Sequence, residues 1–247
     1  MSDYFEIDFL DVGDKKSGDA ITLRYEKDGV TRIHVVDGGY QDFGEKIIEH
    51  IDKYYDSSKA IDSVVLTHQD GDHAGGLREV LREKRVKELW MLKPWDYADE
   101  LIDRFAGYTN VENLIKRLKE IYPNVAVLEE IALEKGIPIK APFQGAKIGD
   151  FTVLTPTKER YLDLIVESDK TPDASKQANF NQGQRLLEKA IAFAVKLVKA
   201  EWGEENFSDE NISAENEMSV VQYANLYGER ILLTADSGRD GLTEAAS

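Results

Sequence analysis

Cysteine is absent from this sequence of 247 residues. Its absence excludes disulfide bonds, a thiolate nucleophile and thiolate-bound metals, so any metal ion must be bound by histidine, carboxylate or amide groups. No apolar run approaches the roughly 20 residues that a bilayer requires, and the first residues contain no basic segment followed by an apolar one. These absences predict a soluble, cytoplasmic protein with no membrane partner.

Positive charge is also scarce, since 31 Lys and Arg residues stand against 47 Asp and Glu and give a formal net charge of −16. Such a charge repels polyphosphates, so we do not expect a broad surface for duplex DNA. A small phosphodiester or a short single-stranded nucleic acid is still compatible as a substrate, because a bound metal ion offsets local repulsion. The composition favours no particular oligomeric state.

The apolar pattern predicts one domain covering residues 1–247, built from both strands and helices. Helical spacing follows Glu45, resumes at Leu77, and starts again after Asn110, which can cap a helix that ends at Tyr122-Pro123. Alternating or continuous apolar runs predict strands at residues 5–12, 21–25, 33–36, 61–66, 89–92, 125–128 and 151–154, and a final hairpin of residues 219–226 and 230–234.

A long segment at about residues 157–213 interrupts this alternation. Its middle has weak order signals, and an amphipathic helix follows, with apolar residues at Leu187, Ile191, Ala194, Val195 and Val198. The acidic residues after this helix are typical of a solvated loop. We predict a helical insertion into the single domain.

Four potential metal ligands lie within six residues directly after the predicted strand at 61–66, namely His68, Asp70, Asp72 and His73. Carboxylates held this close repel each other and raise each other's pKa, whereas a divalent cation removes the repulsion. The alternative is a structural network of Asp–His hydrogen bonds. Because a purely structural hydrogen-bond network would not need two histidines and two aspartates at one strand end, we favour metal binding.

The stretch from Thr67 to Gly76 resembles the signature loop of the metallo-β-lactamase superfamily, usually His-x-His-x-Asp-His, with Asp70 in place of the second His. This variant is similar to the branch that contains the hydrolase domain of the DNA-uptake channel protein ComEC. Further stretches resemble that branch in the same order: Asp11-Val12-Gly13 with Gly18-Asp19-Ala20, Asp37-Gly38-Gly39, Asn216-Glu217-Met218-Ser219 and Leu233-Thr234-Ala235-Asp236.

The resemblance implies an α/β (α+β) fold, an αβ/βα sandwich whose carboxyl-terminal part, with a further His, is missing. It also implies one or two divalent metal ions. His68 and Asp70 would bind the first, Asp72 and His73 the second, and Asp236 both. Asn216 replaces another family His and would be a weak amide ligand. Carboxylate and amide in place of imidazole favour Mn²⁺ or Mg²⁺ relative to Zn²⁺. Because the family commonly binds Zn²⁺, the expected metals are Mn or Zn, with Mg as a further candidate.

The implied activity is metal-assisted hydrolysis by a metal-bound hydroxide, with His68, Asp72 and His73 as catalytic residues and Asp72 orienting the hydroxide. We predict a phosphodiesterase or nuclease-type enzyme. The alternative is a degenerate module that binds metal or nucleotide without turnover, and a purely structural domain would do neither.

Several residues near these motifs allow two interpretations. Asp37, like Asp19, either orients a ligating histidine or simply belongs to a turn. His34 and His50 are interpreted as structural or exposed. Ala235 replaces a family glycine and adds a β-carbon beside Asp236. The aromatic residues Trp90, Trp95 and Tyr97 are more typical of a core than of a pocket.

Overall fold

The computed structural model describes residues 4–12, 18–56, 58–174 and 212–247. Its strands are β1 (Tyr4–Phe9), β2 (Ile21–Lys27), β3 (Val30–Val36), β4 (Ser63–Val65), β5 (Leu89–Trp90), β6 (Ile139–Lys140), β7 (Lys147–Ile148), β8 (Phe151–Thr155), β9 (Val221–Leu226) and β10 (Glu229–Leu233). Its α-helices are α1 (Gly44–Ile51), α2 (Gly71–Ala74), α3 (Leu77–Glu83), α4 (Ala98–Leu101), α5 (Val111–Ile121), α6 (Pro123–Lys135), α7 (Lys158–Glu167), α9 (Ala214–Glu217) and α10 (Arg239–Ala245). Short 3₁₀ or π turns lie at Gln41–Phe43, Asp52–Asp56, Pro94–Tyr97 and Ile102–Arg104. Within the described ranges, no helix has the length and apolar character needed to cross a bilayer.

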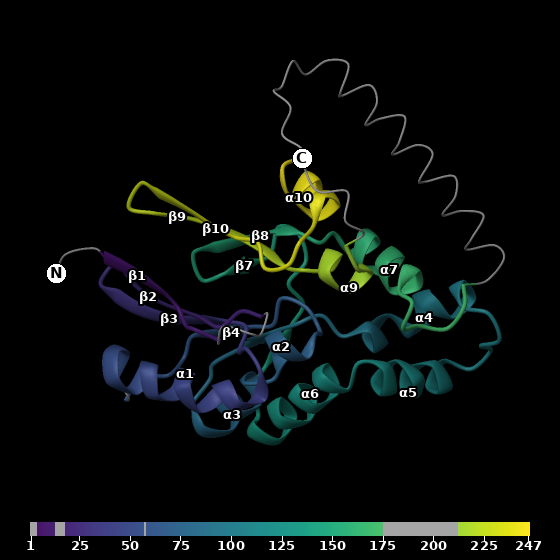
Figure 1. The fold of residues 1–247 in the computed structure, drawn as a ribbon, viewed down its shortest axis with the longest axis horizontal. Coiled ribbons are helices and arrows are strands. Elements are labelled where there is room, and N and C mark those ends of the chain that lie inside the picture. Colours follow the sequence, from purple (N-terminus) through teal and green to yellow (C-terminus); the bar gives the residue numbers. More distant parts are fainter. Residues whose placement is uncertain (1–3, 13–17, 57, 175–211) are drawn as a thin grey trace, which may run out of the picture.

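The strands form two sheets that face each other (Figure 1). The larger sheet has the order β1-β2-β3-β4-β5-β6, in which the first three strands are antiparallel and the later ones join in parallel. The smaller sheet is antiparallel, with the order β10-β9-β8-β7. Parallel pairing requires crossover connections, which run through α1 from β3 to β4, through α2 and α3 from β4 to β5, and through α4, α5 and α6 from β5 to β6. This mixed α/β architecture confirms the predicted fold class.

Apolar side chains fill two layers. One layer lies between the larger sheet and helices α1, α3, α5 and α6, and the other lies between the two sheets. In β2, Leu23 and Tyr25 face the inter-sheet layer, and in β3, Ile33 and Val35 face the helices. Trp90 lies between the sheets and Trp95 is buried with the helices, so both belong to the core as the sequence indicates.

Residues 125–128 form part of helix α6, so the predicted strand there is wrong. Viewed alone, this short apolar run fits a strand. Its continuation at Ile131 and Ala132 completes a buried helical stripe, and Pro123 occupies the first turn, where its missing N–H costs nothing. Tyr122 ends α5 as expected, so the proline that closes one helix also opens the next.

The other predicted elements are largely confirmed. Asn110 caps α5 by accepting a hydrogen bond from the Asn113 N–H. The carboxyl-terminal hairpin forms as β9 and β10. Helix α7 lies in the segment of about residues 157–213 whose status as an insertion stays a prediction, and the amphipathic helix expected from Leu187 to Val198 lies outside the described residues.

His34 is a structural residue at the centre of β3, in agreement with its interpretation from sequence. It is 1% exposed, and its ring stacks on Phe151 with centroids 5.0 Å apart. Its Nδ1 lies 2.6 Å from Ser63 Oγ, and its Nε2 lies 3.1 Å from Gln222 Oε1. The imidazole thus joins neighbouring strands of the larger sheet to the smaller sheet.

We expect His34 to make stability depend on pH. Burial lowers the pKa of His34 from 6.5 to about 4. Between these values the unfolded chain binds a proton that the folded chain does not, so the free energy of unfolding falls as pH falls, by about 3 kcal/mol in total. Urea unfolding of wild type and His34→Gln at pH 7 and pH 4.5 measures this contribution. The variant should lose less stability on acidification, and equal losses would assign the effect to other groups.

Candidate metal centre

The loop that follows β4 is held tightly against the loop that follows β3. The Gly38 N–H donates to the carbonyl of His73 at 2.7 Å, and a Cβ on Gly76 would lie 2.1 Å from the carbonyl oxygen of Gly38. Only glycine allows this approach of the two backbones. The packing fixes α2, which carries His73, beside the end of β3, where Asp37 lies.

Two segments distant in sequence, residues 68–73 and the turn at Asp236, bring a candidate ligand group together. His68 lies on the loop after β4, His73 on α2, and Asp236 on the turn after β10. Each offers one ligand atom, and these atoms lie within 4.8 Å of one another. The imidazole centroids of the two histidines are 4.1 Å apart, and His73 Nε2 lies 3.6 Å from Asp236 Oδ1. Both histidines are buried, whereas Asp236 is partly exposed.

Asp37 organises both imidazoles from behind. Its Oδ2 accepts a hydrogen bond from His73 Nδ1 at 2.8 Å and one from Thr67 Oγ1 at 2.6 Å. The same Thr67 hydroxyl lies 3.1 Å from His68 Nδ1. Because the hydroxyl proton points to Asp37, the hydroxyl oxygen is left to accept from the Nδ1–H of His68. Ser219 Oγ, at 3.4 Å, is a second neighbour of that nitrogen.

This hydrogen bonding leaves the Nε2 atom of each histidine as the ligand atom. Both Nε2 atoms are buried and have no hydrogen-bond partner. A buried polar atom without a partner costs free energy, which a bound cation would remove. Imidazoles held through Nδ1 by a carboxylate network, with Nε2 directed at a shared point, are the usual support for a metal ion. The residues present therefore fit a divalent cation.

The electrostatics agree with this fit. Burial and the positive charge of His73 lower the pKa of His68, so its imidazole is neutral and able to bind a metal. Burial also lowers the pKa of His73, but the carboxylates of Asp37 and Asp236 outweigh it and raise that pKa to about 11. The His73 interaction lowers the pKa of Asp236. The point between these groups is thus favourable for positive charge.

The other predicted ligands lie at different distances from this point. Asp70 Oδ2 is 3.8 Å from His68 Nε2, so Asp70 borders the centre. Asn216 donates from Nδ2 to Asp236 Oδ2 at 3.4 Å, and its Oδ1 accepts from the Ser213 hydroxyl at 3.0 Å, so it is placed to orient Asp236. Asp72 is half-buried on α2 and belongs to neither compact group of ligand atoms. Its role as a ligand stays a prediction.

A second group of potential ligands joins Asp19 and Asp37 to His73. Burial, followed by the charge of Asp37, raises the pKa of Asp19. Gly18 places Asp19 there, because its φ of +109° and its contact with the Asp72 backbone exclude a side chain. Asp37 itself has a left-handed φ of +58° at the end of β3, and its carboxylate accepts from His73 Nδ1. The two interpretations of Asp37 are therefore compatible.

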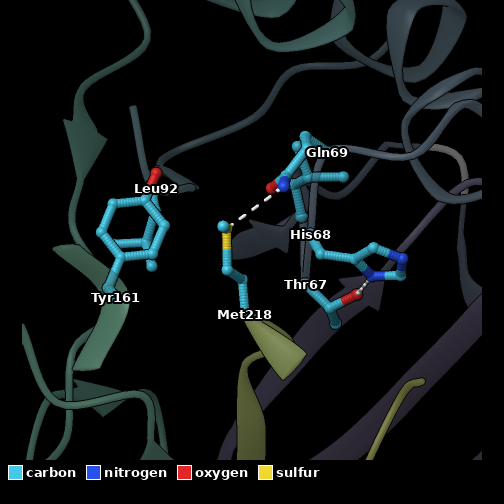
Figure 2. A pocket seen from close by; sticks show the side chains of 7 residues that line it. Thr67, His68, Gln69, Leu92, Tyr161 and Met218 are labelled. Atoms are coloured by element: carbon cyan, nitrogen blue, oxygen red, sulfur yellow. Dashed lines mark hydrogen bonds between the residues drawn. The ribbon is translucent and has the colours of Figure 1, made fainter. Parts of the chain in front are cut away.

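A small pocket opens beside His68 (Figure 2). Gln69 Nε2 donates to the sulfur of Met218 across it at 3.2 Å, and Tyr161 stands on the opposite wall. The Tyr161 hydroxyl is buried without a hydrogen-bond partner. The remaining lining residues are Leu66, Thr67 and Leu92. The pocket places an apolar wall next to the metal centre.

Residues 21–138 match the family described as the metallo-beta-lactamase superfamily, a range that includes Asp37, His68 and His73 but not Asp236. A solved beta-lactamase domain protein from Burkholderia ambifaria is similar at 19% identity with a TM-score of 0.34, over 60% of this chain and 46% of that chain. The chain thus spans less than half the length of that protein. The search of curated proteins found no match.

We expect Asp37→Asn to weaken metal binding by the group of His68, His73 and Asp236, to which Asp37 itself contributes no ligand atom. The amide would donate to His73 Nδ1, which moves the imidazole proton to Nε2 and blocks the ligand atom. Loss of such support typically costs 10- to 100-fold in metal affinity. Calorimetric titration with Mn²⁺ and Zn²⁺ measures it, with Asp62→Asn as the control because Asp62 accepts from the Ile33 N–H away from the centre. Equal affinities in both variants would refute the role of Asp37.

Proposed function

We propose that this protein is a metal-dependent hydrolase of the metallo-β-lactamase superfamily that cleaves phosphodiester bonds. The observation that carries the proposal is the pair of buried Nε2 atoms, on His68 and His73, that lack hydrogen-bond partners and lie, with an Asp236 oxygen, within 4.8 Å of one another. The superfamily match supports it, because that superfamily consists of metal-dependent hydrolases. The motif order further favours its ComEC-type branch.

The residues of the centre would have different roles. His68, His73 and Asp236 would hold one divalent cation, and Asp70 borders the same point from the exposed side. Bound there, such a cation would lower the pKa of water towards about 7 and would polarise a phosphoryl oxygen. Asp37 keeps the His73 proton on Nδ1, and Asn216 orients Asp236. Asp72 is proposed to orient the attacking water.

The substrate preference rests on the ligand set and on charge. Carboxylates next to only two imidazoles form a harder set than three imidazoles would, which favours Mn²⁺ or Mg²⁺ and hence phosphoryl chemistry. A net charge of −16 disfavours long duplex DNA. We therefore propose small phosphodiesters or short single-stranded nucleic acids as substrates.

A binding module without turnover is a second candidate, favoured by the position of Asp72. Because Asp72 lies outside both compact ligand groups, the described residues assemble one cation site more completely than two. A single bound cation would suit the binding of a phosphate group as well as the hydrolysis of a phosphodiester. Turnover distinguishes the two candidates.

We expect hydrolysis of bis-p-nitrophenyl phosphate in the presence of Mn²⁺ or Zn²⁺, with a rate that rises with pH through neutrality. The rise follows because the attacking water must lose its proton, while a side-chain nucleophile is not required. Excess EDTA should abolish the activity and added metal should restore it. Activity that persists in EDTA would refute the mechanism, and metal binding without any turnover would support the binding module.

A further inference from the structure

Lys170 lies at the exposed border of the metal centre. Its Nζ is 3.1 Å from Asp70 Oδ1, while Asp70 Oδ2 is 3.8 Å from His68 Nε2. The Asp70 carboxylate therefore stands between the ammonium group and the buried imidazole. Glu215 Oε1, at 3.9 Å, is a second anionic neighbour of Lys170. No motif in the sequence points to this lysine, which is 100 residues away from Asp70.

The backbone that carries Lys170 is fixed, although its side chain is not. The Lys170 N–H donates to Ser168 Oγ at 3.1 Å, and the Thr171 hydroxyl donates to the carbonyl of Ile165 at 2.7 Å. These bonds attach the turn to the end of α7. The Lys170 side chain is 49% exposed, so its ammonium group can move about a fixed point.

The ion pair of Lys170 with Asp70 is one that a substrate can replace. Exposed ion pairs contribute only about 0–1 kcal/mol, so little is lost when the ammonium group leaves its partner. Other basic side chains of this region are less available, because Arg160 is buried against Glu217 and Lys93 is held by Glu129. Lys170 is thus a cation placed beside the centre and free to turn towards an anion.

We propose that Lys170 binds a nonbridging oxygen of the anionic substrate and thereby selects phosphodiesters over uncharged esters. The inference rests on the proposed hydrolase function. Around the centre, Asp19, Asp37, Asp70 and Asp236 make the surroundings acidic, so an entering phosphodiester is repelled unless positive charge meets it. A bound cation would meet it on one side, and the Lys170 ammonium meets it on the other.

A purely structural role for Lys170 makes different predictions. If the lysine only restrained Asp70, its removal would weaken metal affinity, and every substrate would be affected alike. As a substrate-binding residue, it affects anionic substrates alone and leaves metal affinity equal or tighter, because Asp70 loses a competing cation. The metal affinity and the choice of substrate therefore separate the two roles.

The experiment compares wild type, Lys170→Gln, Lys170→Arg and the control Lys158→Gln. Lys158 is a matched control because it also belongs to the α7 region, is similarly exposed and pairs with Glu100 away from the centre. Three quantities are measured for each chain: Mn²⁺ and Zn²⁺ affinity by calorimetry, inorganic phosphate affinity of the metal-loaded chain, and hydrolysis of bis-p-nitrophenyl phosphate and p-nitrophenyl acetate.

For Lys170→Gln we expect about 10- to 100-fold weaker phosphate binding and a comparable loss in kcat/KM for the phosphodiester, as for a lost charge-assisted hydrogen bond. Acetate ester hydrolysis and metal affinity should not fall, and Lys170→Arg should recover most of the loss. Unchanged phosphate affinity in Lys170→Gln, or a parallel loss of metal affinity, would overturn the proposal. Phosphate binding that depends on Lys170 without turnover in wild type would instead reject the hydrolase function alone.

Discussion

The carboxylate of Asp37 is completely buried, and both histidines of the candidate metal centre depend on it. A buried carboxylate is stable only when hydrogen bonds replace its hydration, and Asp37 accepts them from the Thr67 N–H, the Thr67 hydroxyl and His73 Nδ1. These bonds join the end of β3 to the loop after β4. They also fix which imidazole nitrogens face the candidate cation position.

The sequence predicted well those features whose determinants are local. Local signals predict these elements: the apolar periodicity predicts the antiparallel strands β1 to β3, and the N-cap side chain predicts the start of the helix at Asn110. The turn residues predict the hairpin of β9 and β10. The loop at residues 68–73 was also evident, because its ligand types are adjacent in sequence. Residues 125–128 alone predict a strand rather than helix α6, because four apolar residues do not reveal the helical stripe that continues at Ile131 and Ala132.

Other parts of the centre could not be predicted because they depend on contacts between distant segments. Thr67 stood within the recognised motif, but only the fold shows that its hydroxyl links both histidines to Asp37. Lys170 meets Asp70 across 100 residues of sequence. Ala235, which replaces a glycine of the resembled family, has a φ of +45°, a region that favours glycine. The turn that presents Asp236 is therefore built at some cost in backbone strain.

Locating the bound cation is the most direct test of the candidate metal centre. Crystals soaked in Mn²⁺ and measured near the manganese absorption edge would locate the ion by anomalous scattering. A cation centre formed by these residues predicts a peak within coordination distance of His68 Nε2, His73 Nε2 and an Asp236 oxygen, and a second peak beside Asp72 would add the second site. Manganese bound elsewhere, with the two Nε2 atoms still without a ligand, would contradict it.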